Sequence, residues 1–199
     1  MKAKIFLLLF TFLLILSCQD ESKLRIIEQK KEAQKKEIVF ATINKGWNFN
    51  TQPINGTSQK LLTNWSEWRI FLKELSQKPK SSIGAFQQKA KTLSKKAVDL
   101  NNHIPFTYSK PEIKSRISVI ITKVNAIDLF IHLNQIPDNK IVALVQEINS
   151  DLNAMQLQLE EIDRKNSIKT EDGEADMIRM LDTVRAIPNT HDPKLKPHK

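Results

Sequence analysis

Residues 113–131 read IKSRISVIITKVNAIDLFI, and this stretch decides the fold. Its apolar residues recur at alternating spacings of three and four, at Ile113, Ile117, Ile120, Val124, Ile127 and Ile131. A period of 3.5 residues places these side chains on one face of an α-helix. The strict alternation that is typical of a half-buried strand is absent from the stretch. It therefore predicts a helix with one apolar seam.

Three neighbouring stretches repeat this pattern. They carry Leu61, Trp65, Trp68, Leu72 and Leu75; then Ile83, Phe86, Ala90, Leu93, Ala97 and Leu100; and finally Ile141, Val145, Ile148, Leu152, Met155, Leu159 and Ile162. The connections around Pro79 and Pro137 are short, so consecutive helices should run antiparallel. The sequence predicts an all-α fold: an up-and-down antiparallel helical bundle of four long, heptad-patterned helices.

Helix start and stop signals support these divisions. Pro79 is expected to stop the first helix, and Ser81 or Ser82 can cap the second. Ser109-Lys110-Pro111-Glu112 has the spacing of a capping box with proline in the first turn. Pro137 is expected to end the third helix, and Asp138 can cap the fourth.

The remaining residues complete the domain plan. Asp20–Ala41 is rich in Lys, Glu and Gln and predicts a charged stalk that is helical or partly disordered. Thr42–Gln59 has the composition of a loop, and its Trp47 and Phe49 are expected to cover the end of a core. A short helix is expected over Asp172–Ala186. The predicted regions are a signal peptide (1–17), an anchor with stalk and loop (18–59), a bundle domain (60–188) and a mobile basic tail (189–199).

The first eighteen residues have the form of a signal segment. Lys2 and Lys4 precede the run Ile5–Leu16, which is shorter than the roughly 20 residues that a membrane-spanning helix needs. The run closes on Ser17 and on Cys18, the single cysteine of the chain. An unpaired thiol is uncommon in proteins secreted to an oxidising compartment, and acylation would remove it. A free thiol or an uncleaved signal segment is the alternative.

This ending resembles the lipobox of bacterial lipoproteins, although Ile15 and Leu16 stand where leucine and a smaller residue are usual. The resemblance implies lipid attachment to Cys18 and signal cleavage between Ser17 and Cys18. Gln19-Asp20-Glu21 resembles the acidic export signal of some surface lipoproteins, and could equally begin a solvated linker or mark inner-membrane retention. Attached fatty chains would keep the protein on a membrane, with the outer membrane or cell surface favoured over the inner membrane.

Charge is unevenly distributed along this basic chain, whose formal net charge is +9. From Glu21 to Lys96 there are 16 basic and 6 acidic residues, whereas Glu147–Asp182 holds 10 acidic and 4 basic residues. The basic part, including Lys89, Lys91, Lys95 and Lys96, could attract an anionic partner. Packing of the acidic fourth helix beside the basic helices would also balance the charge, and this internal explanation is preferred.

Motifs for catalysis or cofactor binding are missing from the sequence. With Cys18 assigned to lipid there is no C-x-x-C site, and the histidines form neither an H-x-x-x-H nor an E-x-x-H pair. G-x-S-x-G, Walker A and G-x-G-x-x-G motifs are absent too. We therefore expect no catalytic residue, no metal ligand and no cofactor, and a protein that is not an enzyme.

Three groups of residues allow a functional interpretation beside a structural one. Trp65 and Trp68 could cradle a sugar or an apolar ligand, but core packing is preferred because both lie on the seam. His132 and Met155 could be axial haem ligands, but a boundary histidine and a core methionine are expected. The carboxylates of Glu160, Glu161 and Asp163 most simply form a solvated helix face.

The segment WSEWR (65–69), with Lys78-Pro79 and Ser115-Arg116-Ile117, resembles small helical envelope lipoproteins of unknown function. Asp182-Thr183-Val184 resembles a short acceptor site for O-linked sugar. The leading hypothesis is a membrane-anchored, non-enzymatic binding or structural module whose partner is an envelope protein or an anionic surface polymer, with self-association also open and no role in nucleic-acid binding. The alternative is a helical-bundle carrier of haem, metal or an apolar ligand.

Overall fold

The computed structural model describes residues 18–168, with side chains from Lys23 on. Within that range the regular structure is helical, without strands, which confirms the predicted all-α class. The chain divides into two compact units, Met1–Glu160 and Glu161–Lys199, and the packing described below lies within the first. The short helix and the tail that the sequence predicts near the carboxyl end lie outside the described residues.

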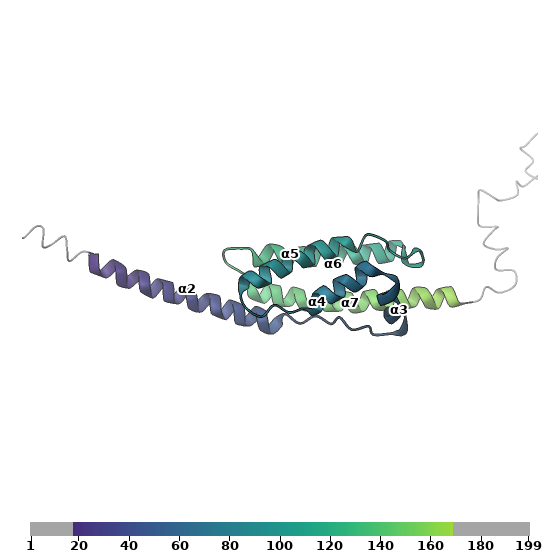
Figure 1. Cartoon of the computed structure of the whole chain (residues 1–199), viewed down its shortest axis with the longest axis horizontal. Coiled ribbons are helices and arrows are strands. Elements are labelled where there is room, and N and C mark those ends of the chain that lie inside the picture. Colours follow the sequence, from purple (N-terminus) through teal and green to yellow (C-terminus); the bar gives the residue numbers. More distant parts are fainter. Residues whose placement is uncertain (1–17, 169–199) are drawn as a thin grey trace, which may run out of the picture. The chain divides into compact units, whose positions relative to one another are not determined.

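The helices follow one another along the chain, with longer connections after α2 and after α5 (Figure 1). They are α2 (Cys18–Gly46), α3 (Gly56–Asn64), α4 (Ser66–Ser76), α5 (Ile83–Asp99), the 3-10 turn η1 (Phe106–Tyr108), α6 (Pro111–Ile131) and α7 (Asp138–Ser167). No helix between residues 18 and 168 has the length and apolar character that a membrane span requires.

The first predicted seam helix is two helices, so that prediction is wrong in its continuity. Trp65 has extended backbone angles (φ −130°, ψ 95°) and separates α3 from α4. Its N–H donates to Leu61 O at 2.9 Å, which closes the end of α3, and its carbonyl accepts from Arg69 N at 3.1 Å, which opens α4. Arg69 Nη1 also donates to Leu62 O, which satisfies a carbonyl at the end of α3. The break leaves both indoles in the core, stacked with centroids 5.8 Å apart.

Only one of the predicted caps forms as expected. Ser82 caps α5, because its hydroxyl oxygen accepts from Ala85 N at 3.2 Å. The capping box at Ser109 is wrong: Lys110 is the residue before α6 and makes no side-chain cap bond, although Pro111 does occupy the first turn. Asp138 lies inside the first turn of α7, where its carboxylate accepts from Asn139 N.

The apolar residues predicted for the seams form the core. Every one of them is buried except Ile83, which is half-buried at the start of α5. The predicted positions of Trp47 and Phe49 are confirmed, because Trp47 packs edge-on against Phe86 at 5.0 Å and Phe49 packs against Trp47 at 5.6 Å. Burial of so much apolar surface is the dominant stabilising contribution to a fold of this kind.

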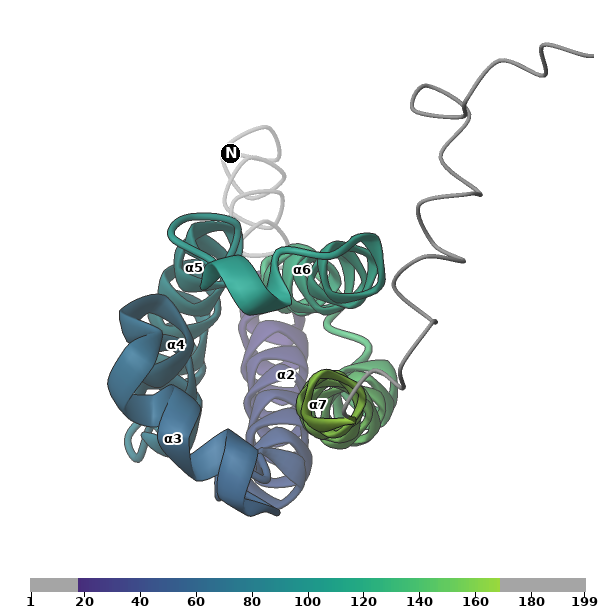
Figure 2. The same cartoon turned by 90° about the vertical axis from the view of Figure 1, so that its right-hand side faces the viewer.

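Neighbouring helices in the first unit are joined by polar bonds that fix their direction. Gln87 Nε2 donates to Ile131 O at 2.9 Å and Ser94 Oγ to Asn125 Oδ1 at 2.6 Å, so residues further along α5 meet residues further back along α6. These two helices therefore run antiparallel, and both views show them side by side (Figure 2).

The same reasoning applies to α6 and α7. Arg116 Nη2 donates to Gln158 Oε1 at 3.3 Å, and Lys123 Nζ lies 2.8 Å from Asp151 Oδ2. Residues further along α6 therefore meet residues further back along α7. The two helices are antiparallel.

Helix α2 has two different halves. Every side chain from Lys23 to Ile38 is exposed, and Figure 1 shows no described helix alongside this half. Beyond it the helix enters the core: Phe40 packs against Phe86, and Ile43 is fully buried. The loop predicted from residue 42 therefore begins five residues later, after α2 ends at Gly46.

An extended segment follows α2 and lies along α7. Asn149 Oδ1 accepts from Asn50 N at 2.8 Å, and Asn149 Nδ2 donates to Asn48 O at 2.9 Å. Two turns further on, the buried Gln156 accepts from Ile54 N through its Oε1 at 3.1 Å. The two amide side chains thus supply partners for a backbone that has no helix or sheet of its own.

Candidate functional site

The predicted lipid-attachment residue is the first residue of α2 as described. Cys18 is followed in that helix by Gln19, Asp20 and Glu21, the residues of the predicted export signal. Ser17 and the signal segment lie outside the described residues. Cys18 is therefore connected to the core by the exposed half of α2.

The four basic residues singled out on α5 have different surroundings. Lys89 pairs with Glu74 of α4 at 2.6 Å, and Lys96 pairs with Asp99 of α5 itself at 3.1 Å. Lys91 and Lys95 are exposed, and within residues 18–168 neither has an ion-pair partner. The preferred explanation, that these lysines balance the acidic fourth helix, is therefore wrong for α5.

The carboxylates of α7 are balanced by α6 instead. Lys123 lies 2.8 Å from Asp151 and 3.2 Å from Glu147. The hydrogen bond to Asp151 is the largest cause of a raised pKa of the Lys123 ammonium group, and the bond to Glu147 adds to it despite partial burial. In the second unit, Arg164 holds Glu161 at 2.7 Å, and this hydrogen bond, with Lys165, lowers the pKa of the Glu161 carboxyl to about 2 against an opposing desolvation effect.

The histidine and methionine considered as haem ligands do not share a site. His132 is exposed, and its Nδ1 lies 2.7 Å from Asp128 O, whereas Met155 is fully buried. Trp65 and Trp68 are both fully buried, as the core interpretation predicts. Among residues 18–168, no three His, Cys, Asp or Glu side chains are grouped closely enough to hold a metal ion.

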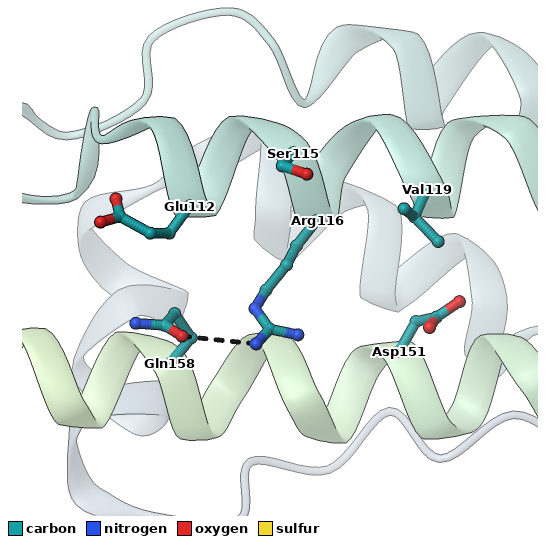
Figure 3. Close-up of a pocket in the computed structure, with 6 residues that line it drawn as sticks. All are labelled: Glu112, Ser115, Arg116, Val119, Asp151 and Gln158. Atoms are coloured by element: carbon teal, nitrogen blue, oxygen red, sulfur yellow. Dashed lines mark hydrogen bonds between the residues drawn. The ribbon is translucent and has the colours of Figure 1, made fainter.

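The structure does contain a groove on the surface between α6 and α7 (Figure 3). It has a volume of about 340 Å³, and a second hollow of about 280 Å³ adjoins it on α6, where the two share Ser115 and Val119. The first is lined by Glu112, Ser115, Arg116, Val119, Asp151 and Gln158, and the second by Ser115, Ser118, Val119, Thr122 and Lys123. We define the residues of the first hollow as the α6–α7 groove; the second is lined by α6 residues alone.

Short side chains explain why this surface is hollow. Ile113, Ile117 and Ile120 point into the core from α6, whereas its opposite, exposed face carries Ser115 and Ser118. These hydroxymethyl groups are short, so the exposed face of α6 is low there. Arg116 lies on the side of α6 that faces α7: it is half-buried and extends across to Gln158 (Figure 3).

The hydroxyl groups and the guanidinium group lie on different sides of α6. Ser118 Oγ donates to Lys114 O at 3.0 Å and Thr122 Oγ1 donates to Ser118 O at 2.8 Å, so these hydroxyl protons are used within α6. Both side chains are exposed, and their oxygens are left as acceptors. Arg116, on the side that faces α7, offers only donors.

The groove was not predicted from the sequence, in which Ser115-Arg116-Ile117 contributed only to a resemblance. Ser115, Ser118 and Thr122 do follow helical spacing opposite the isoleucine seam, as an exposed stripe of short polar side chains would. The depth of the groove also depends on how closely α7 approaches α6. That distance is a property of the packed helices and cannot be read from one stretch.

Comparison of this chain with protein-family models gives no match. Neither a curated protein nor a solved structure matches it. Its function must therefore be inferred from the residues themselves.

Proposed function

We propose that this chain is a lipid-anchored protein of the cell envelope that acts as a non-enzymatic binding or structural module. The observation that carries the proposal is the exposed half of α2, Lys23–Ile38, which lies between the candidate lipid-attachment residue Cys18 and the core. A helix with no buried face is not explained by packing within the first unit. A helix that holds a domain away from a membrane would have all its side chains exposed in this way.

The dimensions suit such a spacer. At 1.5 Å per residue, the helix from Cys18 to Ile38 would hold the core about 30 Å from the lipid. Basic and acidic residues alternate along it, as in Lys30-Lys31-Glu32 and Lys35-Lys36-Glu37. Opposite charges three and four residues apart support an isolated helix. An outer-membrane or cell-surface location agrees with the acidic residues after Cys18, with the inner membrane as the other option.

We further propose that the core is an up-and-down antiparallel bundle. The antiparallel directions of α5 with α6 and of α6 with α7 support this arrangement. The Glu74–Lys89 ion pair across the connection from α4 to α5 agrees with it as well. Such a bundle would present the α6–α7 groove to a partner, which we take to be an envelope protein or an anionic polymer.

A carrier of haem, metal or an apolar ligand is the weaker proposal. Its candidate ligand His132 is on the surface and bonded to its own helix, and large aromatic side chains fill the core around Trp47, Trp65 and Trp68. Absorbance and metal analysis of natively purified protein would distinguish a carrier from a binding module.

Mass spectrometry of the amino-terminal peptide tests the anchor. We expect the wild-type peptide to begin at Cys18 with the mass of attached fatty chains, and the protein to partition into detergent. Cys18→Ala should give an unacylated, unprocessed or misprocessed protein, while the matched change Ser22→Ala in the same segment should leave acylation intact. An unmodified Cys18 thiol in the wild-type protein would contradict the proposal.

A further inference from the structure

The outer face of α5 carries positive charge and no negative charge. The residues exposed along this helix recur at helical spacing, and we define them as the α5 outer face: Gly84, Gln88, Lys91, Lys95 and Val98. The opposite face of the helix is buried in the core. Figure 2 shows α5 between α4 and α6, the two helices that contact it.

The two lysines of this face repel each other. Lys91 and Lys95 are four residues apart, about 6 Å along the helix axis, and like charges at this spacing destabilise a helix. Asp99 lies four residues beyond Lys95, but it pairs with Lys96 at 3.1 Å instead. Among residues 18–168, no carboxylate lies within 4.0 Å of either ammonium group. No described ion pair therefore offsets the repulsion.

The neighbouring helices do not supply the missing negative charge. On α4, Glu74 is already held by Lys89 at 2.6 Å. On α6, the carboxylate of Asp128 lies 3.3 Å from His132 of its own helix and pairs with no lysine of α5. An anion from outside the protein would balance the α5 outer face.

The spread of the lysines favours an extended anion over a compact one. Lys80 is exposed in the connection that leads into α5, and the helix from its start to Lys95 is about 18 Å long. A single sulfate or phosphate group cannot contact lysines spread over this length, whereas a linear polymer can. The protein's own bilayer is not the partner, because the proposed stalk of about 30 Å exceeds the screening length of about 8 Å at physiological salt.

We propose that the α5 outer face, extended by Lys80, binds a linear anionic polymer of the cell envelope, with Lys91 and Lys95 as contact residues. This inference rests on the proposed binding function and selects the polymer as its partner. Exposed ammonium groups bind such a chain as separate point charges. Each contact releases counterions from the polymer, so affinity must fall as the salt concentration rises.

Biolayer interferometry with the full-length chain in a non-ionic detergent tests this assignment. The probe is immobilised dextran sulfate, and uncharged dextran is the reference surface. We expect binding to dextran sulfate alone. Changing Lys91→Gln and Lys95→Gln together should weaken that binding about tenfold at low salt and reduce the slope of log Kd against log salt by about 1 to 1.5.

The double change Lys31→Gln and Lys35→Gln is the matched control. These lysines are also exposed and four residues apart, but they lie on the half of α2 where glutamates alternate with lysines. Affinity and salt slope should stay nearly unchanged in this control. Both double variants should melt at the wild-type temperature, because exposed side chains contribute little to stability, so a loss of binding does not reflect a loss of fold.

The proposal is overturned by absent binding to dextran sulfate, by wild-type affinity in the Lys91 and Lys95 variant, or by equal losses in the two double variants. It is also overturned if sodium sulfate displaces the polymer far better than sodium chloride of equal ionic strength, which would indicate a site for a compact anion. Detergent partition of the same preparation reports the anchor separately. An anchored protein that fails to bind the polymer refutes the α5 assignment alone, and a protein that binds it without lipid refutes the anchor alone.

Discussion

Glu67 links two segments that are distant in sequence. Its Oε1 lies 2.8 Å from His103 Nδ1, and its Oε2 accepts from Ser66 Oγ at 2.7 Å. Burial alone would raise the pKa of the Glu67 carboxyl, but the bonds from Ser66 and His103 outweigh it and hold the pKa below its usual value of 4.5. His103 has a φ of 51°, in the left-handed region, so this bond also helps to hold a strained turn after α5.

We predict that Glu67→Gln destabilises the protein only where Glu67 is ionised. A depressed folded pKa contributes stability that is fully present above the unfolded value and is lost as the pH falls through the folded pKa. At pH 6 the variant should therefore lose about 0.5–1 kcal/mol of unfolding free energy, and the difference should vanish as the pH falls well below 4.5. Urea unfolding at several pH values measures it.

Glu32→Gln is the matched control, since Glu32 lies on the exposed half of α2. It should show no pH-dependent difference from the wild type. A loss in Glu67→Gln that stays constant down to pH 3 would mean that the ionised carboxylate is not the source of the stability.

At the residue scale, the sequence predicted which side chains are buried better than it predicted their partners. The 3.5-residue spacing identified Ile117, Ile148 and Met155 as core residues because burial depends on the face of a helix. It did not identify Asn149 and Gln156 as partners of an extended segment. Those bonds join residues about a hundred positions apart, and no local pattern encodes them.

Between elements, the contact of α2 with α7 depends on a missing side chain. Gly46 is the last residue of α2, and a Cβ added there would clash with both methyl groups of Val142 on α7. Because a β-branched side chain has little rotamer freedom, Val142 cannot easily move aside. Gly46 thus sets how closely the end of α2 approaches α7.

We predict that Gly46→Ala costs about 1–3 kcal/mol of unfolding free energy through overpacking. Val142→Ala removes the two methyl groups, so Gly46→Ala should cost much less in that background, in a double-mutant cycle measured by thermal or urea unfolding. Gly56→Ala is the matched control, because its added Cβ meets no atom within 4 Å. Strictly additive costs for Gly46→Ala and Val142→Ala would show that the close approach does not govern packing here.

Element boundaries were predictable only where a local signal acted alone. The Ser82 cap was correct because its hydroxyl and the N–H it accepts from are three residues apart. The break at Trp65 was missed, since seam spacing continues unchanged across it and nothing such as Gly or Pro marks it. Burial of two stacked indoles there takes precedence over an unbroken helix.

At the scale of the whole molecule, the sequence indicated a location but not a partner. The lipobox resemblance depends on residues at the amino end, and the lipid attachment and signal cleavage that it implies remain predictions. The uneven distribution of charged residues could be counted from the sequence, but which of them form ion pairs could not. In the structure Lys123 of α6, and not the α5 lysines, pairs with the carboxylates of α7. Lys91 and Lys95 stay exposed and are the α5 residues best placed to act on an outside partner.

The two halves of α2 give a prediction about the whole chain. Residues 24–37 have only exposed side chains, so deleting them should change the unfolding free energy by no more than about 0.5 kcal/mol. Ile43→Asp, in the buried half of the same helix, should cost several kcal/mol because it buries an unpaired charge. Thermal melting compares the two.

The same deletion tests the spacer. In vesicles that carry the lipidated protein and a dansyl-labelled lipid, removing fourteen residues should bring the core tryptophans about 21 Å nearer the bilayer, and energy transfer from tryptophan to dansyl should rise steeply. Replacing residues 24–37 with a different helical sequence of equal length should leave the transfer unchanged, since length and not side-chain identity sets the reach. Equal transfer before and after the deletion would mean that α2 does not stand away from the membrane, and the exposed half would then need a binding partner to explain it.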